Sequence, residues 1–120
     1  MKGYFNISDY RGFLLIEVAV EKFDFFMISE NSGPLRLLLA ERHYPSCIID
    51  CLKVKLIDSS VFGFLLEAGN TIKKIGNDIV IVCDDPEVLH VMNMLRLPQM
   101  IRVFATREKA VDYLNSLKDM

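Results

Sequence analysis

A carboxylate and two hydroxyls stand side by side at Asp58, Ser59 and Ser60, inside the stretch LIDSSVFGF at residues 56–64. The apolar residues before them are typical of a strand, and the apolar run after them is typical of a helix. Such side chains at the start of a helix have three possible uses. They can cap the helix, they can include a nucleophile, or a serine can itself be modified by phosphorylation.

Nucleophilic catalysis finds little support in the rest of the chain. Ser59 would need a general base, and neither His43 nor His90 falls in a loop that leaves the same edge of the expected sheet. The chain also lacks the G-x-S-x-G motif of hydrolases and a Gly-rich phosphate loop followed by Lys. We therefore expect a protein that is not an enzyme, and a small enzyme using Ser59 is the weakest hypothesis.

Phosphorylation suits the position of these serines better. A serine in the first turn of a helix lies where free backbone N–H groups and the helix dipole stabilise a phosphate. A phosphate adds about −1.5 to −2 charges, and Asp58 beside it is already acidic. A partner docked there would lose contacts or be repelled. The pattern predicts a switch without catalysis, with Ser59 as the phosphorylation site and Ser60 as the alternative.

The elements that position these residues alternate between strands and helices. We expect a strand pair within residues 4–20, followed by a helix over 32–45 that could begin earlier, near Ile28. The remaining expected elements are strands at 47–52, 56–57, 78–83 and 100–105 and helices at 59–77, 84–97 and 107–120. This order predicts an α/β fold in a single domain over residues 1–120. Its sheet is mixed, mostly parallel and four- to five-stranded, with about four flanking helices.

Acidic residues follow several of the expected strands. Parallel strands end at the same edge of a sheet, and functional sites collect at that edge. Asp50, Asp58 and the pair Asp84 and Asp85 should all lie there. We expect an acidic rim around the two serines, with a helix cap or a turn as the simpler explanation for each Asp taken alone.

The helix after the serines carries an unusually wide apolar face. Its apolar residues cover an arc of about 200°, whereas a surface helix needs about 100°. Hydrophobic residues also make up 52% of the chain. We expect Leu65 and Ile72 in the core, and Phe64 and Leu66 at exposed margins where a partner could bind. Complete coverage of the arc by neighbouring helices is the alternative.

Composition argues against several classes of function. The formal net charge of −2, with scattered Lys and Arg, does not suit a nucleic-acid binder. No apolar run is long enough to cross a bilayer, and no signal peptide is visible. Cys47, Cys51 and Cys83 form no C-x-x-C pair, which indicates structural thiols in a reducing compartment. We expect a cytoplasmic monomer or weak homodimer without metal or cofactor.

The segment over residues 47–114 resembles the STAS domain family, typified by bacterial anti-sigma factor antagonists. The likeness lies in an apolar strand with Asp (CIID), an Asp-Ser-Ser step into a helix, and a second apolar strand (DIVIVC). A helix rich in Val and Leu and a short strand ending in Phe complete the order, and EKFD adds a looser match upstream. Val61 and Arg96 stand where glycine is usual in the family. The β-branched Val61 is expected to crowd the approach to Ser59.

This resemblance implies a STAS-like fold and a binding module that is switched by phosphorylation. In the antagonists, the anti-sigma factor is a serine kinase that phosphorylates the first serine after the Asp, and a phosphatase restores it. The unphosphorylated form binds the anti-sigma factor and frees the sigma factor. By position the phosphorylated serine is Ser59. A STAS scaffold that binds without being modified, in a stress-signalling or transport-associated complex, is the main alternative. We expect partner contacts at Asp58, Ser60, Val61, Phe62, Phe64, Asp84 and Asp85.

Overall fold

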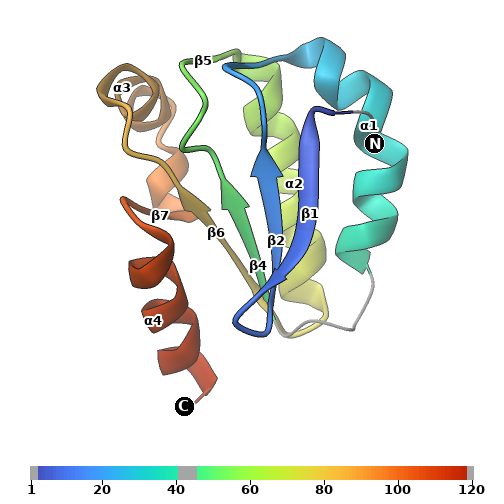
Figure 1. Ribbon diagram of the computed structural model, residues 1–120, viewed down its shortest axis with the longest axis vertical. Coiled ribbons are helices and arrows are strands. Elements are labelled where there is room, and N and C mark those ends of the chain that lie inside the picture. The colour runs from blue at the N-terminus through green and yellow to red at the C-terminus, as the bar shows by residue number, and fades with distance from the viewer. Residues whose placement is uncertain (1–2, 41–45, 119–120) are drawn as a thin grey trace.

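Five strands form the main sheet in the computed structural model, which describes residues 3–40 and 46–118 (Figure 1). Their spatial order is β1-β2-β4-β6-β7. The β1–β2 pair is antiparallel, and the other neighbours are parallel. The strands span Phe5–Tyr10 (β1), Phe13–Val18 (β2), Ser46–Asp50 (β4), Asp78–Val82 (β6) and Arg102–Phe104 (β7). This arrangement confirms the expected mixed, mostly parallel sheet.

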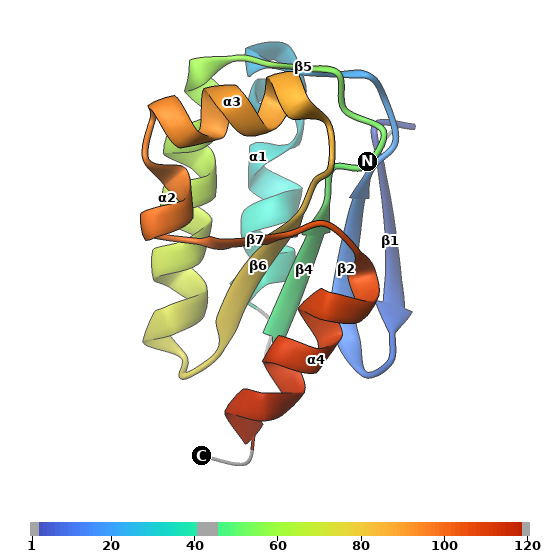
Figure 2. The ribbon, with the colours of Figure 1, turned by 90° about the vertical axis from the view of Figure 1, so that its left-hand side faces the viewer.

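Four α-helices in the described part of the chain surround this sheet. They span Phe25–Ala40 (α1), Ser59–Lys74 (α2), Pro86–Met94 (α3) and Arg107–Lys118 (α4), and a 3-10 turn covers Leu97–Gln99 (η1). Figure 2 shows α1 and α2 behind one face of the sheet and α4 in front of the other. The helix α3 crosses the end of the sheet at which β4 and β6 terminate.

Side chains of the central strands alternate between two cores. Ile49 and Ile81 belong to the larger core, which also contains the buried residues of α1 and α2. Ile48 and Val80 belong to the smaller core with Leu114 of α4. Because both faces of the sheet are covered, β4 and β6 have no polar alternation. This explains why they read as continuous apolar runs in the sequence.

A second, two-stranded sheet lies at the carboxyl end of the main one and was not expected from the sequence. Lys22–Phe23 (β3) pairs in parallel with Leu56–Ile57 (β5). The backbone N–H groups of Lys55 and Leu56 both donate to the carbonyl of Glu21, at 2.7 and 3.0 Å. Because β3 leads into α1 and β5 leads into α2, this pairing brings the starts of the two helices together.

The helix α1 begins earlier than either expected start. It starts at Phe25, because the carboxylate of Asp24 accepts a hydrogen bond from the backbone N–H of Met27 at 3.1 Å and so caps the first turn. Pro34 lies inside the helix rather than in its first turn. The expected end of this helix, at 41–45, and His43 within it lie outside the described residues.

The strand β4 ends at Asp50, two residues before the expected boundary. A carboxylate oxygen of Asp50 accepts a hydrogen bond from the backbone N–H of Leu52 at 2.8 Å. Asp side chains that bond to the backbone two residues ahead form turns, and this contact directs the chain out of the sheet.

Candidate functional site

Asp58 lies between the starts of α1 and α2 and bonds to both. One carboxylate oxygen accepts a hydrogen bond from the backbone N–H of Ser60 at 2.8 Å, which caps α2. The other accepts from the backbone N–H of Phe25 at 3.0 Å, at the first residue of α1. Since the free N–H groups at a helix start carry partial positive charge, the carboxylate stabilises two helix ends at once.

The small sheet determines this geometry. The backbone N–H of Asp58 donates to the carbonyl of Phe23 at 3.2 Å, one residue beyond the paired Phe23 and Ile57. The parallel register therefore places the residue after β5 beside the residues after β3. The Asp58 side chain reaches Phe25 as a result, although the two residues are 33 positions apart.

These hydrogen bonds hold the pKa of Asp58 below its ordinary value of 3.8. The largest cause is the hydrogen bond from the Ser60 side chain, and backbone N–H groups at Phe25, Ser60 and Val61 add to it. Donors that bond to a carboxylate favour its charged form. Asp58 is therefore a fixed negative charge directly beside Ser59.

The two serines differ in what their hydroxyls do. The Ser60 hydroxyl donates a hydrogen bond to the same Asp58 oxygen that accepts the Ser60 backbone N–H. Ser59 is exposed, and its hydroxyl bonds to no residue that the structure describes. Its oxygen is open to a reagent from solvent, whereas that of Ser60 is held in the helix cap. Within the described residues, no hydrogen bond joins Ser59 to His90.

Asp85 caps α3 at this edge of the sheet. A helix cap is the simpler explanation that the sequence offered for each Asp taken alone. The Asp85 carboxylate accepts hydrogen bonds from the backbone N–H groups of Glu87 and Val88 at 3.0 and 3.1 Å. Lys55 lies 3.4 Å from the other oxygen. The Val88 bond is the largest cause that holds the pKa of Asp85 below 3.8. The neighbouring Asp84 is exposed to solvent.

Asp50 does not join the acidic rim, which corrects that part of the expectation. Its carboxylate is buried and forms an ion pair with the guanidinium of Arg107, at the start of α4. The same guanidinium bonds to Glu17 at 3.1 Å, and Glu17 is the β2 neighbour of Asp50 in the sheet. Arg107 thus pairs with both carboxylates on the α4 side of the sheet, and Lys53 lies 3.9 Å from the other oxygen of Glu17. Sequence reasoning missed this cluster because Arg107 is 57 positions from Asp50.

The wide apolar face of α2 is covered, so the expected exposure of Phe64 was wrong. Phe64 is 7% exposed and Phe62 is 5% exposed, and both belong to the larger core, where α1 packs against α2. Leu66 is half-buried. Leu65 and Ile72 are core residues, as expected. Phe62 and Phe64 therefore present little side-chain surface to a partner.

Val61 is also buried, with no exposed surface, and packs in the larger core. The expectation that its branched side chain crowds Ser59 was therefore wrong. A helix that starts at Ser59 directs residue 61 inward and leaves residue 59 outside. Val61 contributes to the core beneath the site and does not shield the Ser59 hydroxyl.

The exposed apolar side chains near the serines come from other elements. Phe25 and Phe26 in the first turn of α1 are largely exposed, and their rings pack edge to face at 6.0 Å. Leu56 in β5, two residues before Asp58, is also exposed. We name Phe25, Phe26 and Leu56 the apolar rim. The adjacent phenylalanines were a signal in the sequence, but an α1 start placed near Ile28 or Ser32 left them outside the helix.

The three cysteine side chains are buried in the larger core. Cys47, Cys51 and Cys83 are free thiols and buried, and burial raises the pKa of each. Within residues 3–40 and 46–118, no three side chains of His, Cys, Asp or Glu are grouped so that they could hold a metal ion. None of the helices in those ranges combines the length and apolar character needed to cross a membrane.

Comparisons with solved structures identify several similar folds. The anti-sigma factor antagonist SpoIIAA in its unphosphorylated form aligns with a TM-score of 0.77 at 17% identity, covering 93% of this chain and 96% of SpoIIAA. An anti-sigma factor antagonist from Mycobacterium paratuberculosis gives 0.83 at 15% identity, with 92% of each chain covered. A variant of RsbS from Moorella thermoacetica gives 0.76 at 18% identity, covering 97% of this chain and 98% of RsbS.

No curated protein sequence matches the chain significantly. The family model of the STAS domain matches residues 4–110. That range contains the seven strands that the structure describes and the caps at Asp58 and Asp85, and it ends within α4. The chain is a member of the STAS domain family.

Proposed function

We propose that this protein is an anti-sigma factor antagonist whose binding is switched off by phosphorylation of Ser59. In its unphosphorylated form it binds an anti-sigma factor that is a serine kinase, and so releases a sigma factor in the cytoplasm. A serine phosphatase reverses the modification. The observation that carries the proposal is the contrast between the serines. Ser59 is exposed and its hydroxyl bonds to none of the described residues, whereas the Ser60 hydroxyl is held by Asp58.

The similar structures support a phosphorylation switch of this kind. SpoIIAA has been solved in an unphosphorylated and a phosphorylated form. This chain has the corresponding fold and carries its two serines at the start of the helix that follows β5. For this chain, binding of an anti-sigma factor and phosphorylation of Ser59 are what we propose.

The electrostatics of the site explain how a phosphate would act. The carboxylate of Asp58 already accepts the N–H groups of Ser60 and Phe25, so it occupies the positions that would stabilise an anion. A phosphate on Ser59 would add about −1.5 to −2 charges beside this carboxylate. Two lysines at this edge are already paired with carboxylates, Lys55 with Asp85 and Lys22 with Asp24. The added charge therefore stays largely uncompensated. It repels an acidic partner surface, and it disfavours contact with an apolar one because the phosphate would lose its hydration.

The apolar rim supplies the attractive part of the interface. Phe25, Phe26 and Leu56 are exposed next to the capped helix starts, and exposed aromatic side chains in such positions often anchor protein partners. We propose that the kinase contacts this rim together with Asp58 and Ser60. In this proposal the apolar rim makes the partner contacts that were expected from the sequence at Phe62 and Phe64.

Phosphate-affinity gels of the protein incubated with its anti-sigma factor kinase and ATP test the site. We expect wild type and Ser60→Ala to shift and Ser59→Ala to remain unshifted. Ser60→Ala is the matched control, because it removes a hydroxyl at the same helix start. A shift that persists in Ser59→Ala would contradict the assignment. Tight binding without phosphorylation of any variant would instead indicate an unmodified scaffold.

Calorimetric titration with the same kinase tests the switch itself. Ser59→Ala should bind like wild type, and Ser59→Glu should bind at least about tenfold more weakly, equivalent to about 1.4 kcal/mol. Ser60→Glu would disrupt the cap that Asp58 forms at the start of α2. The thermal unfolding of each variant must therefore be compared before its affinity for the kinase is interpreted. Equal affinity of Ser59→Ala and Ser59→Glu would show that charge at this position does not control binding.

A further inference from the structure

The outer edge of β1 is an unpaired edge of the main sheet. β1 stands first in the order β1-β2-β4-β6-β7, so β2 is its one neighbour in that sheet. In Figure 2, β1 lies at the margin of the sheet, with no described helix or strand beyond it. The opposite margin is β7, which has three residues, whereas β1 has six. A long strand edge is a template for pairing with another strand.

The turn between β1 and β2 sets the hydrogen-bonding phase of β1. Arg11 and Gly12 have φ of 53° and 88°, and two successive residues with positive φ are typical of a type I′ hairpin turn. The residues that flank this turn, Tyr10 and Phe13, lie opposite each other in the register and form a hydrogen-bonded pair. Because such pairs alternate along an antiparallel ladder, every second residue of β1 directs its backbone groups toward β2.

The other end of β1 has the same phase. The carbonyl of Tyr4 accepts a hydrogen bond from the backbone N–H of Ala19, in the chain just after β2, at 2.7 Å. Even-numbered residues of β1 therefore face β2, and the odd-numbered residues direct their N–H and C=O groups away from the sheet. These outward residues are Phe5, Ile7 and Asp9.

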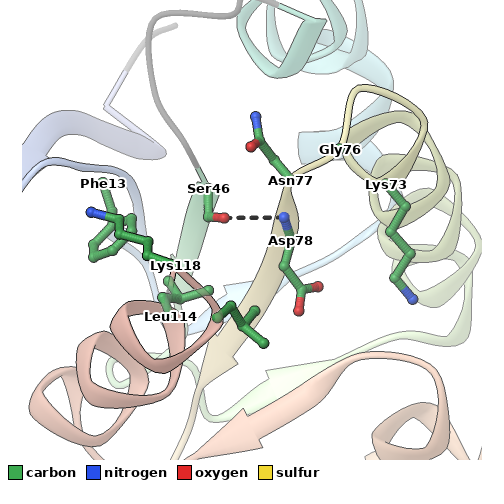
Figure 3. Close-up of a pocket in the computed structure, with 9 residues that line it drawn as sticks. Phe13, Ser46, Lys73, Gly76, Asn77, Asp78, Leu114 and Lys118 are labelled. Carbon is green, nitrogen blue, oxygen red and sulfur yellow. Dashed lines mark hydrogen bonds between the residues drawn. The ribbon is translucent and has the colours of Figure 1, made fainter. Parts of the chain in front are cut away.

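The outward backbone groups of β1 differ from those of the inner strands. At the start of β6, the backbone N–H of Asp78 donates to the Ser46 hydroxyl at 3.0 Å, on the wall of the cavity of about 350 Å³ in Figure 3. Within the described residues, no hydrogen bond of this kind reaches the outer side of β1. Its three N–H and three C=O groups remain available to a second strand.

β1 also lacks the common features that protect a strand edge. Lysine, proline and bulges often block such pairing, but β1 contains neither of these residues and its register with β2 runs without interruption. Ile7, near its centre, is 36% exposed. This side chain lies on the same face as Phe5, which belongs to the larger core. In Figure 2, α1 does not extend behind β1, so no helix covers Ile7.

We propose that this edge pairs with β1 of a second copy of the chain, antiparallel and around a two-fold axis at Ile7. Ile7 then lies opposite Ile7 of the second copy, and Phe5 lies opposite Asp9 of the second copy. Each of the three pairs exchanges two backbone hydrogen bonds, which gives six in total. The two exposed Ile7 side chains cover each other, and the two five-stranded sheets continue as one.

Charge and hydrogen bonding favour this register, and the strand is its own complement in it. An axis at Asn6 or Ser8 aligns two outward pairs instead of three. An axis at Asp9 places two carboxylates directly opposite each other, which is destabilising. With the axis at Ile7, Asp9, the one charged residue of β1, faces Phe5. The formal net charge of −2 per chain adds little repulsion between copies.

The interface is small, so the dimer is weak. One strand edge with one apolar pair buries less surface than a standard interface, and we expect a Kd on the order of 0.1 mM. Ser59 begins α2 and is not part of the pairing edge. The inference is therefore independent of the proposed switch.

Sedimentation velocity of the full chain between about 10 μM and 1 mM tests the pairing. We expect the average mass to rise toward that of a dimer. Ile7→Pro removes an outward N–H, and proline is tolerated in edge strands where that group faces solvent. Ile7→Lys places two ammonium groups opposite each other and serves as the second variant. Each substitution should weaken association at least about tenfold.

Leu37→Lys is the matched control, because it introduces the same charge at an exposed apolar residue of α1. It should associate like wild type. Circular dichroism of each variant checks that the fold is unchanged. Ser59→Glu should also associate like wild type, so failure of this proposal is separable from failure of the switch.

Disulfide cross-linking tests the register. Opposed Cα atoms of antiparallel strands lie about 4.5–5.5 Å apart, within the range of a disulfide, and the native cysteines are buried. Ile7→Cys should therefore form a covalent dimer with oxidised glutathione. Asn6→Cys and Ser8→Cys should not cross-link singly, because identical residues then lie about 8 Å apart. A mixture of these two variants should cross-link, because Asn6 lies opposite Ser8 of the second copy.

Several outcomes would overturn the proposal. These are a chain that stays monomeric at about 1 mM, association that Ile7→Pro and Ile7→Lys leave unchanged, or an equal loss in Leu37→Lys. Cross-linking of Ser8→Cys alone as efficiently as Ile7→Cys would likewise contradict the two-fold axis at Ile7.

Discussion

Asp58 and Phe25 join two helices through one hydrogen bond, from the backbone N–H of Phe25 to the carboxylate of Asp58 at 3.0 Å. The same carboxylate caps α2 through the N–H of Ser60. The residue next to the proposed phosphorylation site is therefore also the residue that holds the starts of α1 and α2 together. The apolar rim and the serines are positioned relative to each other by this contact.

Replacement of Asp58 should lower the free energy of unfolding. Loss of an N-cap typically costs about 0.5–2 kcal/mol, and we expect Asp58→Ala to fall near the upper end because two helix starts lose an acceptor. Asp58→Asn, which keeps a neutral acceptor, should lose less. Urea unfolding at neutral pH measures both variants, and an unchanged stability of Asp58→Ala would contradict the bridging role.

Because the pKa of Asp58 is lowered, its contribution to the free energy of unfolding depends on pH in a defined way. A carboxyl with a folded-state pKa below its unfolded value contributes stability that is present above the unfolded pKa. That contribution is lost as the pH falls from about 3.8 through the lowered folded-state pKa. The difference in free energy of unfolding between wild type and Asp58→Asn should therefore shrink as the pH falls. Parallel stability curves for the two proteins between roughly pH 5 and 2 would contradict this prediction.

The ion pair between Arg107 and Asp50 should contribute far more to the free energy of unfolding than an exposed ion pair does. Arg107→Ala leaves the buried Asp50 carboxylate without its cation, and breaking a buried pair typically costs about 3–5 kcal/mol. Because Arg107 is partly exposed, we expect the lower end of that range, about 3 kcal/mol. Denaturant unfolding measures the loss.

Arg36→Ala is the matched control for the buried pair. Arg36 and Glu67 are bonded at 2.9 Å on the surface, with both side chains about half exposed, and such pairs contribute about 0–1 kcal/mol. Similar losses in Arg36→Ala and Arg107→Ala would show that the Asp50 carboxylate does not depend on its partner.

The apolar rim leads to a prediction about partner affinity. Phe26→Ser should weaken binding of the kinase about tenfold or more, as for an aromatic anchor at an interface. Leu37→Ser is the control, because Leu37 is as exposed as Phe26, at 72%, but lies 11 residues along α1, about 16 Å away. Calorimetry measures both affinities. Equal effects of the two substitutions would remove the rim from the proposed interface.

Arg96 adopts a left-handed backbone conformation with φ of 58°, between α3 and η1. Side chains with a Cβ are strained there, by about 1–2 kcal/mol, whereas glycine is not. Arg96→Gly should therefore raise the free energy of unfolding by about 0.5–1 kcal/mol after the entropy loss of glycine. Arg96→Ala keeps the strain and should not stabilise. A lower melting temperature for Arg96→Gly than for Arg96→Ala would contradict this reasoning.

Much of the fold could be predicted from local patterns in the chain. The continuous apolar runs of β4 and β6, the Asp-Pro start of α3 and the order of strands and helices can each be recognised from residues close together in the chain. The same holds for the candidate serines, because an Asp-Ser-Ser step at a helix start is a local feature. These patterns were sufficient for the sheet class, the helix count and the phosphorylation hypothesis.

The sequence by itself thus determined which side chains stand at the start of α2, and the tertiary structure decided what surrounds them. Pairing of β3 with β5 brings Phe25 to Asp58, packing in the larger core buries Phe64, and α4 supplies Arg107 to Asp50. Each relationship joins residues far apart in the chain, and helical periodicity cannot show which neighbour covers a face. Exposure of Ser59 and burial of Val61 depend on that packing. Only the folded chain therefore shows that the Ser59 hydroxyl is open to solvent, whereas the Ser60 hydroxyl is held by Asp58.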